Sequence, residues 1–186
     1  MKKNFNNWPN YSKKEIEVVS KVLRSNKVNY WTGNECKAFE SEFSQWSNSK
    51  FSIALSNGTV ALDLALKALG IKKGDEVIVT PRSFIASVSS VVGSGGVPVF
   101  ADVDLATGNL SAETISTKLT NKTKAIICAH LGGLPCEMDK IMQLAKKNNL
   151  YVIEDCAQAH GAMYKGKSVG SFGHIGTWSF CQDKIM

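Results

Sequence analysis

Two stretches near the start of the chain show the hydrophobic period of an amphipathic helix. The first spans residues 12–25, and its apolar positions fall on one stripe: Ile16, Val19 and Leu23. Ser12 and Glu15 have the spacing of a capping box, which predicts that this helix begins there. The second stretch, residues 35–46, places three aromatic side chains on one face: Phe39, Phe43 and Trp46. Such a stripe is more typical of a hydrophobic core than of a ligand site.

Beyond residue 50, short apolar runs alternate with helical patterns. Runs typical of strands lie at 52–55, 76–80, 97–103, 124–130, 150–154 and 175–180. Helical patterns separate the first five of these runs, at 58–69, 84–93, 111–119 and 137–148. The glycine-rich link 157–174 predicts a short helical turn and a hairpin-like loop. Strand–helix–strand alternation predicts an α/β fold, with a mainly parallel sheet covered by helices on both faces.

The residues at the carboxyl ends of the predicted strands are the first place to look for a ligand site, because open α/β sheets bind ligands there. These positions hold a small strand-to-helix turn, an aromatic ring, acids, a histidine and a lysine: Gly58, Thr59, Phe84, Asp102, Asp104, His130, Asp155, Gln158, Ser179 and Lys184. The turn at Gly58 lets backbone amides approach an anion, although an ordinary helix cap explains it as well. No G-x-G-x-x-G or P-loop motif follows any strand, which disfavours a dinucleotide-binding domain.

Glu154 and Asp155 end one apolar strand. Adjacent strand residues point to opposite faces, so the two acids are not expected to act as a pair. A buried carboxylate needs a partner, either a lysine or backbone amides, or the protonated ring nitrogen of a cofactor. The pattern leaves both alternatives open. A lysine, an acid, an aromatic ring and an anion-binding turn at one sheet edge together indicate pyridoxal phosphate, whose ring nitrogen the acid keeps protonated.

Composition narrows the remaining classes. The net charge is +6, but the lysines come as scattered pairs and no basic run is interleaved with aromatic residues, which disfavours nucleic-acid binding. An anionic small molecule remains a suitable ligand. The first ten residues lack the apolar region of a secretory signal, and no apolar run predicts a membrane span, so we expect a cytoplasmic protein. The five cysteines form no C-x-x-C pair and the three histidines lack zinc-ligand spacing, so buried free thiols and no metal are expected.

Taken together, several segments resemble the DegT/DnrJ/EryC1/StrS family of pyridoxal-phosphate sugar aminotransferases, which have aminotransferase fold type I. The matching segments run in family order from about residue 28 to the end: SNGTVALDLALKALGIKKGDEVIVTPRSFIAS, VPVFADVD, HLGGLPCEMDKI, VIEDCAQAHGAMYKGKSVGSFG and WSFCQDK. Each alone is weak, whereas the set is specific.

The resemblance implies a role for most of the strand-end residues. Lys184 carries the Schiff base, Asp155 pairs with the pyridine nitrogen, and Phe84 stacks on the ring. Gln158 lies near the phenolic oxygen. The phosphate is held by a further group: Gly58, Thr59 and Ser179. Three more residues are candidates for substrate contact, with a structural role as the alternative: His130, His160 and Tyr30.

The implied reaction moves an amino group, usually from glutamate, to a ketone on a nucleotide-linked sugar, for surface polysaccharide or aminosugar biosynthesis. Relatives are homodimers that share sites across the two-fold axis. Some relatives replace the lysine by histidine and are dehydratases; the lysine retained here favours amino transfer. A non-catalytic domain of the same fold is the other alternative.

The resemblance also implies a domain arrangement. Residues 1–27 are expected to form an N-terminal helical segment, and residues 28–186 an incomplete large domain that binds pyridoxal phosphate. Family members continue through one more large-domain strand, between the first and sixth strands, and a C-terminal small domain. We therefore expect a gap in the sheet and a chain that is the front part of a longer protein.

Overall fold

The computed structural model describes residues 9–184, which form two compact units. The first unit comprises residues up to 46 together with 50–54, and contains α1 (Lys13–Arg24) and α2 (Glu35–Trp46). The predicted capping box of α1 is confirmed, since the Glu15 N–H donates to Ser12 Oγ at 3.3 Å and the Ser12 N–H donates to Glu15 Oε2 at 2.6 Å. Phe43 of α2 is buried between two aromatic rings, at centroid distances of 5.4 Å (Phe39) and 5.1 Å (Trp46).

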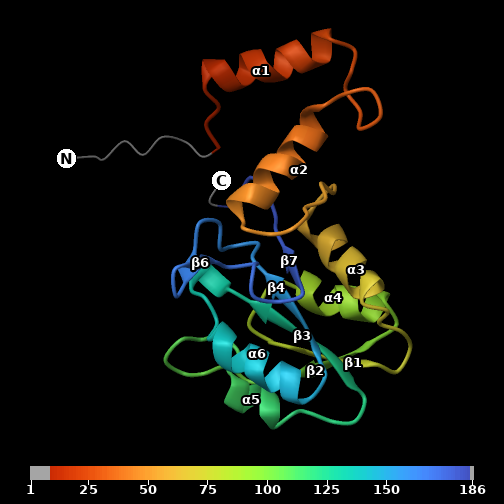
Figure 1. The fold of residues 1–186 in the computed structure, drawn as a ribbon, viewed down its shortest axis with the longest axis vertical. Helices are drawn as coiled ribbons and strands as arrows, with labels where there is room; N and C mark the ends of the chain where they lie inside the picture. Colours follow the sequence, from red (N-terminus) through yellow and green to blue (C-terminus); the bar gives the residue numbers. More distant parts are fainter. Residues whose placement is uncertain (1–8, 185–186) are drawn as a thin grey trace, which may run out of the picture. The chain divides into compact units, whose positions relative to one another are not determined.

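The second unit, residues 47–49 and 55 onward, is built on a five-stranded parallel sheet in the order β2-β1-β3-β4-β7. The strands are β1 (Glu76–Val79), β2 (Val97–Phe100), β3 (Thr123–Ala129), β4 (Tyr151–Asp155) and β7 (Ile175–Thr177). A two-stranded hairpin of β5 (Met163–Tyr164) and β6 (Lys167–Ser168) fills the predicted hairpin-like link. The predicted α/β class with a parallel sheet is confirmed (Figure 1).

Helices cover both faces of this sheet, and each face has its own core. On one face lie α3 (Gly58–Ala68) and α4 (Ala86–Gly93), and on the other α5 (Ala112–Ser116) and α6 (Met138–Lys147) (Figure 1). Alternate strand residues supply the two cores: Val77, Ile127 and Ile153 pack with α3 and α4, whereas Ile78 and Val152 pack with α5 and α6. This alternation follows from the pleat, and it assigns Glu154 and Asp155 to opposite faces.

The strand predicted at 52–55 is wrong. These residues, all within the described range, form no strand, and Ile53 is 68% exposed. A strand is stable only where a neighbour pairs with it. No described strand pairs with residues 52–55, and β7 is an edge of the described sheet. The five described strands pair without interruption, with β7 at one edge. The gap that was expected between residues 52–55 and the last strand is therefore not found within the described sheet.

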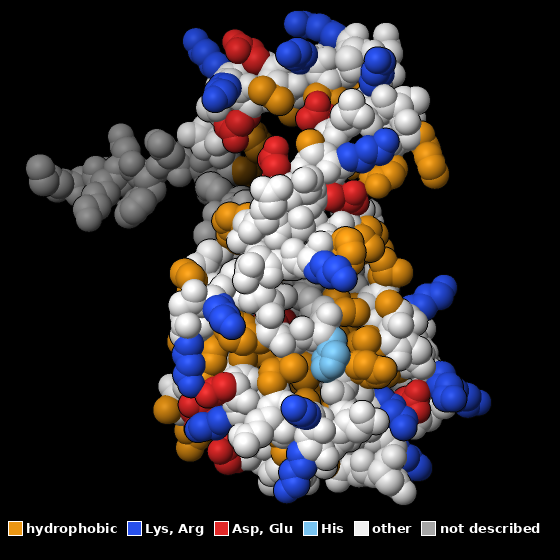
Figure 2. Space-filling view, in the orientation of Figure 1, with side chains coloured by type: hydrophobic (Ala, Val, Ile, Leu, Met, Phe, Trp, Pro, Cys, Tyr) orange, Lys and Arg blue, Asp and Glu red, His pale blue; other side chains and the backbone are white. Residues whose placement is uncertain are grey.

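The distribution of basic side chains and the character of the helices complete the description. On the face drawn in Figure 2, the described lysine and arginine side chains lie in small groups among other residues, as the scattered lysine pairs of the sequence predict. Within residues 9–184, no helix combines the length and the apolar character that crossing a membrane requires.

Candidate active site

A cavity of about 440 Å³ lies at the carboxyl edge of the sheet. Its wall contains most of the residues that the sequence placed at strand ends: Gly58, Thr59, Phe84, His130, Asp155, Gln158, Ser179 and Lys184. They come from segments far apart in the chain, because all strands of a parallel sheet end at the same edge. Asp102 and Asp104 are not part of the lining; Asp104 instead accepts from the Thr107 and Ala106 backbone N–H groups of its own loop.

The anion-binding turn is the start of α3. Asn57 caps the helix, with its Oδ1 accepting from the Val60 N–H at 2.9 Å. Gly58 is required for packing, since a Cβ there would lie 2.9 Å from the Cβ of Ser179 and 3.2 Å from the Trp178 carbonyl oxygen. The absence of a side chain lets the segment after β7 approach the helix N-terminus, so that its N–H groups and Ser179 share one corner of the cavity.

Asp155 ends β4 on the face covered by α3 and α4, and it is 9% exposed. Both carboxylate oxygens have donors: Oδ1 accepts from the Ala157 N–H at 3.1 Å, and Oδ2 accepts from Ser87 Oγ at 3.1 Å. Burial raises the pKa of Asp155, while these two hydrogen bonds and the charge of Lys184 act in the opposite direction. The cavity thus has a buried carboxylate at its wall, next to a cationic side chain.

Lys184 follows a turn in which its N–H donates to the Cys181 carbonyl oxygen at 2.9 Å. Its side chain is 13% exposed, and its Nζ lies 3.3 Å from Asp183 Oδ2 and 5.9 Å from the centroid of the Phe84 ring. Phe84 itself is 63% exposed although it lines the cavity. A flat apolar ring and an amine therefore border the same space.

Gln158 is oriented by a backbone group. The Gly132 N–H donates to Gln158 Oε1 at 2.8 Å, so the oxygen of the amide faces the short helix η1 (Leu131–Gly133). Gly132 has a positive φ of 62°, a conformation that glycine adopts at little cost. With its oxygen fixed, the Gln158 side chain has its NH₂ donors left for a ligand in the cavity.

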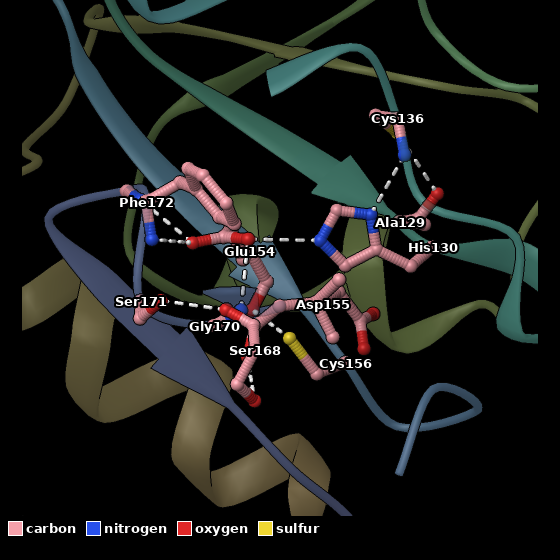
Figure 3. A network of polar contacts seen from close by, with 12 residues as sticks. Ala129, His130, Cys136, Glu154, Asp155, Cys156, Ser168, Gly170, Ser171 and Phe172 are labelled. Carbon is pink, nitrogen blue, oxygen red and sulfur yellow. Dashed lines mark hydrogen bonds and ion pairs between the residues drawn. The ribbon is translucent and has the colours of Figure 1, made fainter. Parts of the chain in front are cut away.

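Glu154 and His130 form a buried network on the opposite face of the sheet (Figure 3). Glu154 Oε2 lies 3.0 Å from His130 Nε2 and accepts from the Gly170 N–H at 2.8 Å. Oε1 accepts from the N–H groups of Phe172 at 2.8 Å and Gly173 at 2.6 Å. Of the alternatives that the sequence left open, backbone amides, together with His130, are therefore the partners of Glu154.

The tautomer of His130 follows from its other nitrogen. The Cys136 N–H donates to Nδ1 at 3.0 Å, so Nδ1 carries no proton, and Nε2 donates to Glu154 (Figure 3). Both ring nitrogens are engaged inside the protein, which favours a structural role for His130. His130, Glu154 and Cys156 place ligand-type atoms within 4.8 Å of one another. The N–H groups already directed at both oxygens of Glu154 make this cluster a poor cation site.

The remaining two substrate candidates lie elsewhere. His160 does not line the cavity; its ring lies 5.2 Å from those of Trp178 and Phe180, and its nitrogens have no hydrogen-bond partner among the described residues. Burial, together with the charge of Lys184, lowers the pKa of His160. Tyr30 belongs to the first unit, where its hydroxyl donates to Glu40 Oε2 at 3.2 Å. Their contact with substrate stays a prediction.

The sequence did not single out Ser83, Ser87 or Cys181. Ser83 and Cys181 line the cavity, and Ser87 holds Asp155 from α4. Serines are frequent in 83–94 and their spacing carries no period that would distinguish one from another. The available signal was positional: Ser83 directly precedes the predicted stacking residue Phe84, and Ser87 lies in the first turn of the helix predicted at 84–93.

Comparisons with known proteins agree with this arrangement. The model of the DegT/DnrJ/EryC1/StrS aminotransferase family matches residues 9–186. The chain is 49% identical over 178 residues to a GDP-perosamine synthase of Escherichia coli O157:H7, covering 96% of this chain and 49% of that protein. It is 43% identical to a dTDP-3-amino-3,6-dideoxy-alpha-D-galactopyranose transaminase of Aneurinibacillus thermoaerophilus, covering 91% of this chain and 46% of that protein.

A solved aminotransferase structure from Psychrobacter cryohalolentis is 66% identical and superposes with a TM-score of 0.97, covering 98% of this chain and 46% of that one. The chain thus spans about half the length of the relatives that it matches. Fold type I and the family resemblance expected from the sequence are confirmed. The chain belongs to the DegT/DnrJ/EryC1/StrS aminotransferase family.

Proposed function

We propose that the protein transfers an amino group from an amino acid, with glutamate as the donor, to the ketone of a nucleotide-linked sugar, using pyridoxal phosphate as cofactor. The observation that carries the proposal is a single cavity in which a buried carboxylate, an amine and an aromatic ring meet: Asp155, Lys184 and Phe84. Two of the relatives described above are named for nucleotide-linked sugars.

The donors and acceptors of the cavity fit this cofactor. Asp155 is a buried acceptor suited to a ring N–H, and Phe84 offers an apolar face for stacking. The N-terminus of α3, beside Ser179, suits a phosphate. The NH₂ group of Gln158 suits the phenolic oxygen. When bound, pyridoxal phosphate supplies an electron sink and a carbon that carries the amino group between the two substrates.

The residues of the chain would then have separate tasks. Asp155 holds a proton on the ring nitrogen, and Phe84 keeps water from one face of the ring. Lys184 Nζ, the amine that borders the cavity, would be the base that takes the proton from the donor α-carbon and the acid that gives it up again. The same amine returns the proton in the opposite direction when the ketosugar accepts the amino group. This sequence predicts ping-pong kinetics.

The test begins with the covalent bond. Protein incubated with pyridoxal phosphate and reduced with borohydride should carry the pyridoxyl label on Lys184 in peptide mapping, and Lys184→Ala should carry none there. Glutamate plus a panel of GDP-, dTDP- and UDP-linked ketosugars should then yield aminosugar and 2-oxoglutarate. A label on another residue, or no absorbance from bound pyridoxal phosphate, contradicts the proposal and favours the non-catalytic alternative. Loss of the sugar hydroxyl without amino transfer would indicate the dehydratase alternative.

Partners and compartment belong to the same proposal. A homodimer is supported by the exposed aromatic residues of the first unit, where Trp31 is 88% exposed, since exposed aromatics often mark contact surfaces. Sedimentation at working concentration tests it, and a fully active monomer would exclude a shared site. The cytoplasm is supported by the free thiols of all five cysteines, which suit a reducing compartment.

A further inference from the structure

The carboxylate of Asp155 is held from two sides by groups of different origin. The Ala157 N–H, two residues along the chain, donates to Oδ1. Ser87 Oγ, from α4 and 68 positions away in sequence, donates to Oδ2 at 3.1 Å. Ser87 is 1% exposed, so its hydroxyl is buried on the protein side of this bond. The local contact accompanies the turn at the end of β4, whereas the contact from α4 fixes the carboxylate relative to another element.

A second hydroxyl continues this contact to the cavity. Ser83 Oγ lies 3.0 Å from Ser87 Oγ, and Ser83 lines the cavity. The direction of the chain is fixed at its inner end, because an ionised Asp155 only accepts hydrogen bonds. Ser87 has one proton and uses it on Asp155, so Ser83 must donate to Ser87. The lone pairs of Ser83, and not its proton, are then left to face the cavity.

We propose that Ser87, supported by Ser83, is a positioning residue that orients the Asp155 carboxylate toward the ring nitrogen of the cofactor and keeps it ionised. The inference rests on the proposed function and adds two residues to its machinery. The bond from Ser87 is more than a means of pairing a buried hydroxyl. Ser90 shows that a buried serine of α4 can lack a hydrogen-bond partner. Ser90 is 1% exposed and its hydroxyl has no hydrogen-bond partner among the described residues.

Burial raises the pKa of Asp155, and the hydrogen bonds from Ala157 and Ser87 oppose that rise. Removing the Ser87 hydroxyl leaves Oδ2 of the buried Asp155 carboxylate without its side-chain donor. The carboxylate is then harder to keep ionised, and only the Ala157 N–H still restrains its side-chain torsion. Both effects weaken the same contact, that between the carboxylate and the protonated ring nitrogen.

The test compares Ser87→Ala with Ser90→Ala in the full protein. The two variants remove the same atom from equally buried positions one turn apart on α4, and only the first loses a bond to Asp155. We expect Ser87→Ala to bind pyridoxal phosphate roughly tenfold more weakly, the usual scale for a lost hydrogen bond to a charged group. We also expect the ¹⁵N resonance of a labelled cofactor ring nitrogen to shift toward the unprotonated form. Ser90→Ala should match the wild type, and Ser87→Thr, which keeps a hydroxyl, should recover most of the affinity.

The outcomes separate this inference from the proposed function. If wild-type protein binds no pyridoxal phosphate, both fail together. If the wild type binds it with a protonated ring nitrogen, and Ser87→Ala equals Ser90→Ala in affinity and in the ¹⁵N signal, only the inference is overturned. Should Ser87→Ala not fold, Ser83→Ala decides. This variant removes the hydroxyl that donates to Ser87, so it should shift the ¹⁵N signal in the same direction by a smaller amount. An unchanged signal refutes the inference that Ser83 and Ser87 together orient Asp155.

Discussion

Replacing Glu154 by glutamine tests how much the network on the far face of the sheet stabilises the fold. The side chain keeps its size and hydrogen-bonding plane but exchanges one oxygen for an NH₂ group. Each carboxylate oxygen of Glu154 accepts two hydrogen bonds. In either amide orientation, the NH₂ group therefore faces two donors, from His130 and Gly170 or from Phe172 and Gly173. His130 cannot relieve the first clash by changing tautomer without losing its bond from Cys136.

The magnitude follows from this count. Two hydrogen bonds to a charged group are lost, each contributing about 1.5–3 kcal/mol. A neutral amide costs less to bury than a carboxylate, which offsets part of the loss. We expect Glu154→Gln to lower the free energy of unfolding by about 2–4 kcal/mol. That is a large share of the roughly 5–15 kcal/mol that separates a native domain from its unfolded state.

The assay is thermal or urea unfolding of the full protein together with hydrogen exchange at the amides of Gly170, Phe172 and Gly173. A loss of 2 kcal/mol corresponds to about thirtyfold faster exchange at these amides if they open locally. Glu137→Gln is the matched control. Its carboxylate lies 2.8 Å from Lys140 Nζ, and both side chains are about half exposed. Its loss should cost less than about 0.5 kcal/mol.

The effect should depend on pH with a defined sign. Burial alone would raise the pKa of Glu154, but the hydrogen bonds from His130, Gly173 and Gly170 outweigh it and leave the pKa below its ordinary value. The carboxylate is thus easier to ionise in the folded state than in the unfolded chain. Its stabilisation is fully present above the unfolded-state pKa, about 4.3, and is lost as the pH falls through the folded-state value.

The difference between wild type and Glu154→Gln should therefore be greatest near neutral pH and should shrink below about pH 4. A Glu154→Gln protein with wild-type unfolding and unchanged exchange at the three amides would falsify the claim that these hydrogen bonds stabilise the fold. A difference that grows on acidification would refute the sign derived for Glu154.

Three further predictions concern the cavity. Gly58→Ala should lower the free energy of unfolding by about 1–3 kcal/mol, because its Cβ would lie 2.9 Å from that of Ser179. It should also weaken phosphate binding, measured by the concentration of inorganic phosphate needed to displace the cofactor; unchanged stability and binding would show that the two segments separate freely. Asp155→Asn should fold like the wild type but lose at least about a hundredfold in turnover, since an amide cannot hold the ring nitrogen protonated; near-normal turnover would contradict the role of Asp155. Phe84→Leu should weaken cofactor affinity by about five- to tenfold while leaving thermal stability nearly unchanged, because the ring is 63% exposed; a large loss of stability would show that Phe84 belongs to the core.

The fold was largely predictable because its signal is carried by long alternations. Continuous apolar runs such as 76–80 and 150–154, separated by helical patterns, indicate buried parallel strands, and the structure has β1 and β4 there. Residues 52–55 show the limit of this reasoning. Their composition is that of a strand, but a strand also requires a partner, and hydrophobicity does not say which segment pairs with it. Ile53 and Phe51 remain exposed.

The candidate site was predictable where topology alone decides. Strand ends of a parallel sheet meet at one edge, so Gly58, Phe84 and Lys184 could be grouped without knowing any distance. Contacts that depend on register could not be predicted. His130 lies on the same face as Glu154 because Cys128 pairs with Glu154 in the β3–β4 ladder. Strand register cannot be read from composition or hydrophobic period, so the partner of His130 could not be predicted. Ser87 was missed for a similar reason, since its contact with Asp155 spans two elements.

The two acids that end β4 have different roles at the cavity. Asp155 faces the ligand side and is held by two donors, whereas Glu154 faces away and is held by four. Three of those four donors are backbone groups of 170–173, the loop that leads into β7 and on to Ser179 and Lys184. The fourth is His130, whose own backbone N–H donates to the Asp155 carbonyl oxygen at 3.1 Å.

His130 is also followed directly by η1, whose Gly132 N–H orients Gln158. Glu154 does not line the cavity, but its hydrogen bonds fix the segments that carry three residues which do: Asp155, Lys184 and Gln158. This network can be rigid because both nitrogens of His130 and both oxygens of Glu154 are engaged within the protein. The face toward the ligand needs an ionised acid with a lone pair that is still available to accept from the N–H of a ring nitrogen. Asp155, with fewer donors than Glu154, meets that need only while Ser87 holds it.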